Sequence, residues 1–99
     1  MPTPQESSRA LRACRERIDK VDERIVELLN ERTSIVQEIG RIKSEAHLAV
    51  YEPRREDEVF ANVTAINSGP LPDAALRRIF ERIIDEMRKV QKDRMEKNF

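Results

Sequence analysis

The chain has little of what builds sheets, disulfide scaffolds or haem and aromatic pockets. Its 99 residues include one cysteine, two glycines, three phenylalanines, one tyrosine and no tryptophan. A single cysteine excludes an intramolecular disulfide, and the place of Cys14 among apolar residues predicts a buried thiol in a reducing compartment. With 38% charged residues and so few aromatics, the composition favours helix over sheet.

An excess of charge of one sign and long apolar runs are also missing. Nineteen basic residues balance nineteen acidic ones, so no overall field attracts nucleic acid or an anionic membrane. No apolar run approaches the length of a membrane span, and residues 1–8 lack the pattern of a secretory signal. We therefore expect one cytoplasmic domain with no nucleic-acid or membrane partner.

A first long helix is predicted over residues 8–46, because no proline interrupts this stretch. Ser7 or Ser8 is the expected cap, and residues 1–7 are expected to be disordered. Gly40 is a tolerated weak point, which costs about 1 kcal/mol relative to alanine.

Two shorter helices follow. The second opens at Pro53, a residue favoured at the first helical position, and ends at residues 67–70, where Gly69 suits a left-handed conformation and a proline prevents continuation. The third starts near Asp73 and fades after Gln91. The predicted domain is thus residues 8–92, followed by a charged tail, residues 93–99.

An apolar stripe runs along the first helix with spacings that alternate between three and four. Its members are Leu11, Cys14, Ile18, Val21, Ile25, Leu28, Arg32, Ile35, Ile39 and Ile42. This helix would be roughly 57 Å long, whereas a compact chain of this size has a radius of gyration of about 13 Å. Two short helices cannot cover the stripe, so we predict an obligate dimer with the long helices packed together.

Several polar residues occupy apolar faces. Arg32 interrupts the stripe, Lys43 lies on nearly the same face eleven residues later, and Gln91 continues the apolar face of the third helix. Taken singly, Arg32 could pair with a carboxylate and Gln91 could be a buried hydrogen-bonding residue. Together with Arg55 and Glu56 they suggest a site for a small polyanion in a helical bundle.

Other charged residues need no special explanation. The basic residues of the third helix are interpreted as a solvated face: Arg77, Arg78, Arg82, Arg88 and Lys89. Arg15 lies 17 residues before Arg32, roughly 25 Å along the axis. It cannot share a pocket with Arg32 of its own chain, but it could reach the pocket of an antiparallel partner.

The order and spacing of these residues resemble the all-helical chorismate mutases, the AroQ class. The resemblance covers residues 11–91, and no single motif is decisive. The matching stretches are residues 15–22 (RERIDKVD), 28–32 (LLNER), 39–43 (IGRIK), 53–56 (PRRE), 67–71 (NSGPL), 79–80 (IF) and Gln91.

The resemblance implies an all-α, intertwined homodimer of three-helix chains with two active sites. It implies an isomerase that converts chorismate, a dianion, to prephenate by an internal [3,3] rearrangement in phenylalanine and tyrosine biosynthesis. That reaction needs no cofactor, metal, nucleophile or general base. The protein must hold the reactive conformer and stabilise charge on the breaking ether oxygen.

By resemblance, Arg15 of the partner chain and Arg32 grip the two substrate carboxylates, since an arginine fork suits a carboxylate. Lys43 and Gln91 donate to the ether oxygen. Arg32, Lys43 and Gln91 are the expected catalytic groups, with Arg15 as a binding residue.

Three acidic and basic residues at the start of the second helix are expected to bind the rest of the substrate. Glu56 accepts from the ring hydroxyl, Glu52 lies beside it, and Arg55 orders this corner. Met87 departs from the family pattern, because a methionine stands where a small or hydroxyl residue is common and cannot donate to a carboxylate.

Two other functions stay open at this point. One is an isochorismate pyruvate-lyase, which shares the fold and the anion grip; the connecting loop and Gln91 favour the mutase. The other is a non-catalytic regulatory dimer of the shikimate pathway, acting in a complex with another enzyme of that pathway.

Overall fold

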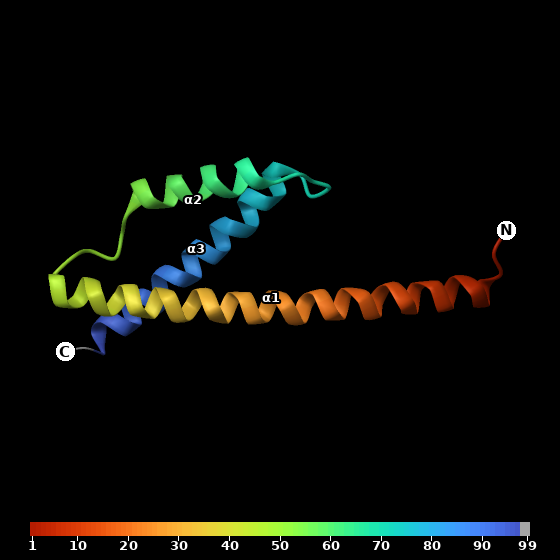
Figure 1. Cartoon of the computed structure of the whole chain (residues 1–99), viewed down its shortest axis with the longest axis horizontal. Coiled ribbons are helices and arrows are strands. Elements are labelled where there is room, and N and C mark those ends of the chain that lie inside the picture. Colours follow the sequence, from red (N-terminus) through yellow and green to blue (C-terminus); the bar gives the residue numbers. More distant parts are fainter. Residues whose placement is uncertain (98–99) are drawn as a thin grey trace. The chain divides into compact units, whose positions relative to one another are not determined.

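The computed structural model describes residues 1–97, and these form helices joined by short loops. The helices are α1 (Pro4–Ala46), α2 (Pro53–Ile66) and α3 (Asp73–Glu96), in the order that Figure 1 shows along the chain. The predicted all-α, three-helix chain with a long first helix is confirmed. The residues form two units, 1–32 and 33 onward, so that α1 contributes to both.

The start of α1 differs from the prediction by about one turn. The helix begins at Pro4, and Thr3 caps it. The Thr3 hydroxyl accepts a hydrogen bond from the Glu6 backbone at 3.1 Å, and the Thr3 amide donates to the Glu6 carboxylate at 3.3 Å. This reciprocal capping box satisfies amides at the helix start that would otherwise have no partner. The predicted start at Ser8 is therefore wrong.

The end of α3 also lies beyond the predicted one. The helix continues to Glu96, and the Lys97 amide donates to the Asp93 carbonyl at 3.1 Å. Most of the predicted tail, residues 93–99, is therefore helical, while residues 98–99 lie outside the described part of the chain.

Residues 1–32 contain no buried side chain among those described. The stripe of α1 is open to solvent here, from Leu11 through Ile18, Val21 and Ile25 to Leu28. Cys14 is exposed as well, so the prediction of a buried thiol is wrong for the single chain. Within residues 1–97, no helix combines the length and apolar character needed to cross a bilayer.

The core of the second unit lies on another face of α1. In its last turns Val36, Gly40, Lys43 and Ser44 are buried, and Ile84 and Met87 of α3 are buried as well. The stripe residues of the same turns stay exposed: Ile35, Ile39 and Ile42. The second unit therefore packs through a face of α1 that is displaced from the stripe by about one residue, or roughly 100° around the helix.

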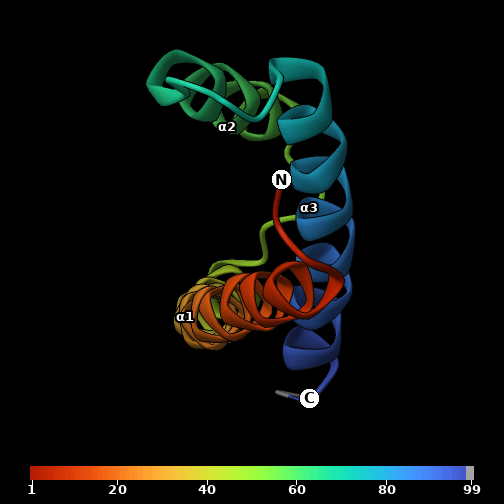
Figure 2. The same cartoon turned by 90° about the vertical axis from the view of Figure 1, so that its right-hand side faces the viewer.

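Helices α2 and α3 pack against each other (Figure 2). The Arg77 guanidinium of α3 lies over the ring of Phe60 of α2, 4.3 Å from its centroid. This stacking contributes a cation–π attraction to the contact between the two helices.

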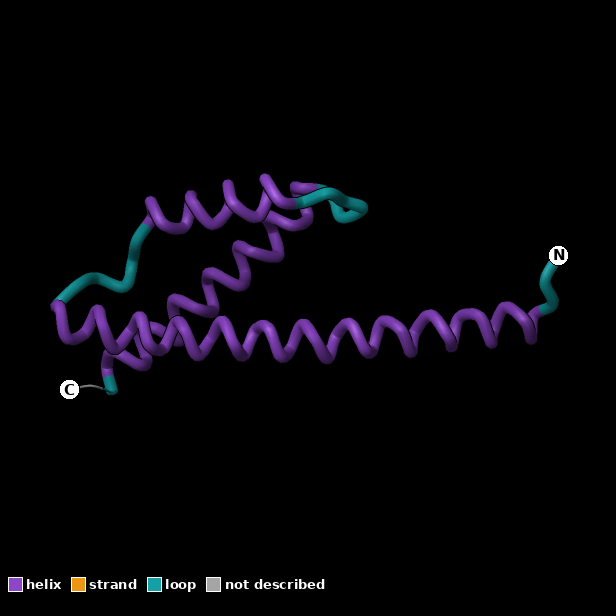
Figure 3. Tube along the Cα trace, in the orientation of Figure 1, coloured by secondary structure: helices purple, strands orange, loops and turns teal. Residues whose placement is uncertain are grey.

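Two loops join the helices, residues 47–52 and 67–72 (Figure 3). In the second loop, the Asn67 amide donates to the Leu71 carbonyl at 2.8 Å and to the Asp73 carboxylate at 2.7 Å. Gly69 has a φ of 77°, so the predicted left-handed glycine is confirmed. These contacts tie the end of α2 to the start of α3.

Candidate active site

Lys43 is the centre of a buried polar cluster in the second unit. Its side chain is only 8% exposed. The ammonium donates to the Gln91 amide oxygen at 2.7 Å and to the Val50 carbonyl at 3.1 Å, and it forms an ion pair with Glu52. A lysine has three N–H donors, and these three partners satisfy all of them. The buried charge is therefore paired and fully hydrogen-bonded, as burial of an ammonium requires.

Gly40 explains why α3 comes so close to Lys43. It lies one turn before Lys43 on the same buried face of α1. A Cβ atom at this position would lie 3.1 Å from the backbone carbonyl oxygen of Gln91 and 3.3 Å from the Arg94 Cβ. From the sequence alone, Gly40 is predicted only as a weak point of the helix. Its spacing of three from Lys43 was the signal that could have marked it as a site of close helix approach.

The orientation of the Gln91 amide follows from the chemistry of its partner. A lysine ammonium carries donors and no acceptor, so the atom of Gln91 that faces Lys43 must be the side-chain oxygen Oε1, as observed. The amide nitrogen, with its two N–H donors, is then not used in the contact with Lys43. The cluster thus combines a fixed cation with a neutral donor.

Glu52 connects the cluster to α2. It is the N-cap residue of that helix, and its carbonyl accepts from the Glu56 amide at 3.1 Å. Its carboxylate is 53% exposed and forms an ion pair with Lys43, whereas its contact with Glu56 is through the backbone. The sequence had placed Glu52 beside Glu56 and had not identified it as the carboxylate that holds Lys43.

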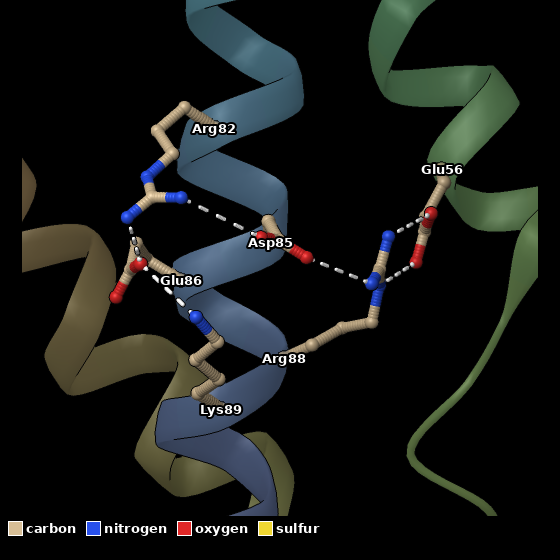
Figure 4. Close-up of polar contacts among 6 residues, drawn as sticks. All are labelled: Glu56, Arg82, Asp85, Glu86, Arg88 and Lys89. Carbon is tan, nitrogen blue, oxygen red and sulfur yellow. Dashed lines mark hydrogen bonds and ion pairs between the residues drawn. The ribbon is translucent and has the colours of Figure 1, made fainter.

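Glu56 contacts Arg88, an arginine that the sequence predicts to lie on a solvated face. Arg88 of α3 donates from Nε to the Glu56 Oε2 at 2.7 Å and from Nη2 to Oε1 at 3.1 Å (Figure 4). The Glu56 side chain is only 20% exposed, and that of Arg88 is 39% exposed. The solvated-face interpretation of Arg88 is therefore wrong: two parallel hydrogen bonds join it to the residue expected to bind the ring hydroxyl.

The electrostatics of Arg88 reflect this pairing. Hydrogen bonding to Glu56 raises the pKa of the Arg88 guanidinium above its ordinary value, partial burial opposes the rise, and the charges of Glu56 and Asp85 add to it. The Arg88 Nη1 also donates to Asp85 at 3.2 Å. Arg88 is therefore a permanent cation between two carboxylates.

Two other predicted site residues have different neighbours. Arg55 pairs with Glu58 on its own helix at 3.3 Å, and both side chains are more than half exposed. Met87 is buried, and its sulfur accepts a hydrogen bond from the Thr33 hydroxyl at 3.5 Å. Met87 thus belongs to the core beside the cluster.

Arg15 and Arg32 lie on the other unit of the chain, residues 1–32. Arg15 is exposed, whereas Arg32 is half-buried. Along α1 they are separated by about 25 Å, so one chain cannot bring both to the same small molecule. The structure therefore assembles Lys43, Glu52 and Gln91 directly, and Glu56 with Arg88.

The cluster has a definite chemical capacity. A buried ammonium beside a neutral amide donor can stabilise negative charge that develops on an oxygen atom, since both groups are in place beforehand. Neither group has to gain or lose a proton to donate a hydrogen bond.

Known sequences that match this chain include chorismate mutases. The chorismate mutase type II family matches residues 14–92. A bifunctional chorismate mutase/prephenate dehydratase of Aquifex aeolicus is 38% identical over 86 residues, which are 83% of this chain. This chain spans about a quarter of the length of that relative, 24%. A chorismate mutase of Methanocaldococcus jannaschii is 25% identical over 83 residues, and the match covers 84% of it.

Solved structures agree in fold. Form II of the chorismate mutase from Thermus thermophilus superposes with a TM-score of 0.82 at 40% identity, over 84% of this chain and 94% of that one. A conserved hypothetical protein from Pyrococcus furiosus gives a TM-score of 0.69 at 35% identity, over 83% of this chain and 95% of that one. The matched family covers the whole Lys43 cluster, and the chain belongs to the chorismate mutase type II family.

Proposed function

We propose that this chain is an isomerase that rearranges chorismate to prephenate without a cofactor. The observation that carries the proposal is the hydrogen bond between Lys43 and Gln91 in a buried site. It places an ammonium and an amide side by side, as a pair of donors to one ether oxygen would need. Charge on that oxygen grows as its bond to carbon breaks, so donors fixed in advance lower the barrier.

Substrate binding requires an exchange of partners at Lys43. All three of its donors are occupied by protein oxygens, so one of them must be released to the substrate. Glu52 is the partner that can turn away, because its carboxylate is half-exposed and can be rehydrated at low cost. The Gln91 oxygen would stay on Lys43 and keep the amide nitrogen directed at the ether oxygen.

The remaining predicted residues would grip the rest of the substrate. Arg32 and Arg15 would hold the two carboxylates, with Arg15 supplied by a second copy of the chain. Glu56 would accept from the ring hydroxyl, and Arg55 would approach the same corner. Met87 would supply apolar contact only, since a thioether does not donate a hydrogen bond.

A homodimer is part of this proposal. The exposed stripe of residues 1–32 is too apolar to be explained as a solvated helix face. A second copy whose long helix packs on the stripe would bury it, and an antiparallel arrangement would bring its Arg15 near the first Arg32. The predicted cytoplasmic location and the predicted complex with another shikimate-pathway enzyme stay predictions.

The proposal is tested by the loss of chorismate absorbance with the purified full chain. Wild type should convert chorismate, and Gln91→Ala should reduce kcat by about 10²- to 10³-fold, as loss of a single oxyanion donor does. Arg32→Ala should raise KM strongly, and Arg41→Ala, on the exposed side of α1, serves as the control. A wild type no faster than Gln91→Ala and Arg32→Ala would refute the enzymatic proposal. Pyruvate release from isochorismate, without prephenate from chorismate, would support the lyase instead.

Subunit mixing tests the shared site. Arg15→Ala and Arg32→Ala chains should each be inactive alone, and a mixture in which subunits exchange should regain some activity. Exchange is followed by mass spectrometry of differently tagged chains. Exchange without recovered activity would show that Arg15 does not act across the interface.

A further inference from the structure

The contact between Arg88 and Glu56 has a consequence for substrate recognition. We propose that Arg88 is a positioning residue, which holds the Glu56 carboxylate in the position and plane needed to receive the ring hydroxyl of chorismate. This inference rests on the function proposed above, and it deepens the role of one side of that site.

The geometry of the fork carries the argument. Nε and Nη2 of Arg88 contact the two different oxygens of Glu56, at 2.7 and 3.1 Å. Two parallel hydrogen bonds fix both the position and the plane of a carboxylate, which one contact cannot do. A carboxylate has about four lone-pair sites, so the fork uses one on each oxygen and leaves the others for a hydroxyl donor.

The positive charge of Arg88 also matters for binding of a dianionic substrate beside Glu56. Glu56 is an anion only 20% exposed, and the proposed substrate carries two negative charges. Like charges repel more strongly where water is partly excluded. A cation bonded directly to Glu56 offsets that repulsion and leaves its oxygens as acceptors. Glu56 alone would weaken binding of a dianion, whereas the Glu56–Arg88 pair can accept the hydroxyl without that penalty.

Arg88 is itself held in place from α3. Its Nη1 donates to Asp85 at 3.2 Å, and Asp85 also lies 3.9 Å from the Arg82 guanidinium (Figure 4). Arg88 also lies over the Tyr51 ring, 5.9 Å from the centroid. The guanidinium is thus fixed on several sides before it meets Glu56, as a positioning group requires.

A double-mutant cycle tests whether Arg88 acts on KM through Glu56, and a parallel stability measurement separates positioning from a purely structural clamp between α2 and α3. The variants are Arg88→Gln, Glu56→Gln and the combination of both. Steady-state kinetics with chorismate give KM and kcat, and thermal unfolding followed by circular dichroism gives stability. Arg82→Gln is the matched control, because it removes an arginine that also faces Asp85 but does not contact Glu56.

Arg88→Gln should raise KM about tenfold and lower kcat less, as expected when Glu56 loses its two charge-assisted hydrogen bonds to Arg88. In the Glu56→Gln background the same change should alter KM by less than about threefold, because coupled residues are not additive. Arg88→Lys should give an intermediate KM, since it keeps the charge but loses the fork. It also carries the test if Arg88→Gln does not fold.

The contrary results are distinct. An equal effect of Arg88→Gln on KM in both backgrounds would show that Arg88 does not act through Glu56 and would overturn the inference. Lowered stability with an unchanged KM would show a structural clamp and overturn it as well. Kinetics indistinguishable from Arg82→Gln would also overturn it. In each of these cases wild type would still convert chorismate, so the proposed function would stand. An inactive wild type would instead refute the proposed function and, with it, this role of Arg88.

Discussion

The two units of the chain differ in which side chains they expose and which they bury. Residues 1–32 leave apolar side chains such as Ile25 and Leu28 exposed and bury nothing among the described residues. The second unit buries an ammonium, Lys43, and gives each of its donors a partner. One unit has apolar surface in excess of what its own chain covers, and the other satisfies its own polar groups.

The difference separates what one chain can do alone from what needs a partner or substrate. A single helix has no neighbour for its apolar face, and helices in proteins gain most of their stability from packing. A buried cation, in contrast, needs oxygen partners within the same folded chain, because an unpaired buried charge lowers the free energy of unfolding by several kcal/mol. The first unit therefore leaves an apolar face that the proposed dimer would cover, and the second holds its buried cation with partners from its own chain.

The largest effect is expected from a charge placed on the exposed stripe. Ile25→Glu would bury an unpaired carboxylate in each half of the proposed dimer, at a cost of several kcal/mol per site. We expect monomers in sedimentation velocity and a loss of activity of at least about 100-fold, since each site would lose its partner Arg15.

Glu27→Gln is the matched control for this variant, because it lies about 200° around the helix from Ile25 and keeps the stripe intact. It should remain dimeric and active. A dimeric, active Ile25→Glu protein would show that the stripe is not the association surface.

A smaller effect is expected where α1 and α3 meet at Gly40. Gly40→Ala would place a methyl group 3.1 Å from the Gln91 carbonyl oxygen and 3.3 Å from the Arg94 Cβ, so α3 must shift. We expect kcat to fall about tenfold, because displacement of a catalytic group by a fraction of an ångström is costly. Stability should not rise, although alanine favours helix by about 1 kcal/mol.

Arg41→Ala, next to Gly40 but exposed, should leave kcat unchanged. A stabilised Gly40→Ala protein with full activity would show that the close approach at this glycine does not position Gln91.

A modest effect is expected for the ion pair that covers Lys43. Glu52→Gln keeps the size of the side chain and removes its charge, and it should lower kcat by less than about fivefold, because the Glu52 carboxylate is half-exposed and water screens its charge. KM should not rise, because one negative charge near a dianionic substrate is lost. Steady-state kinetics at low ionic strength would detect both changes. A large rise in KM would mean that Glu52 binds the substrate itself.

The smallest effect is expected from pH. Gln91 donates through an amide that does not ionise, so kcat should be flat near neutral pH. The pKa of Arg88 is raised, and a raised pKa gives stability that is lost only as pH rises through it. For an arginine this lies far above neutrality, so the guanidinium of the Glu56–Arg88 pair stays charged. A sharp optimum in the pH profile of kcat would contradict this expectation.

Much of the helical framework was predictable from local signals. Pro53 at the first position of α2 and Gly69 after its end both lie where the sequence predicted them. The predicted start of α1 is one turn late, because the serines at positions 7 and 8 are also common caps, whereas the pattern Thr3-Pro4-Gln5-Glu6 forms a complete capping box. Such local rules depend on neighbours in the chain, so they can be read without a fold.

The candidate site was predicted less evenly. Lys43 and Gln91 stood out because polar residues interrupted apolar faces, and the structure joins them at 2.7 Å. Arg88 did not stand out, since nothing on its own helix marks it off from other exposed arginines. Only the approach of α2 brings Glu56 to it, and this contact spans 32 residues of sequence.

The sequence by itself determined three helices, their approximate ends and the unusual residues Arg32, Lys43 and Gln91, because periodicity and turn residues act locally. Tertiary structure decided which face of α1 is buried. Val36, Gly40 and Lys43 pack within the chain, while Ile35, Ile39 and Ile42 stay exposed. Both faces satisfy the same helical period. The buried face is the one that contacts α3, which can approach closely because Gly40 has no side chain.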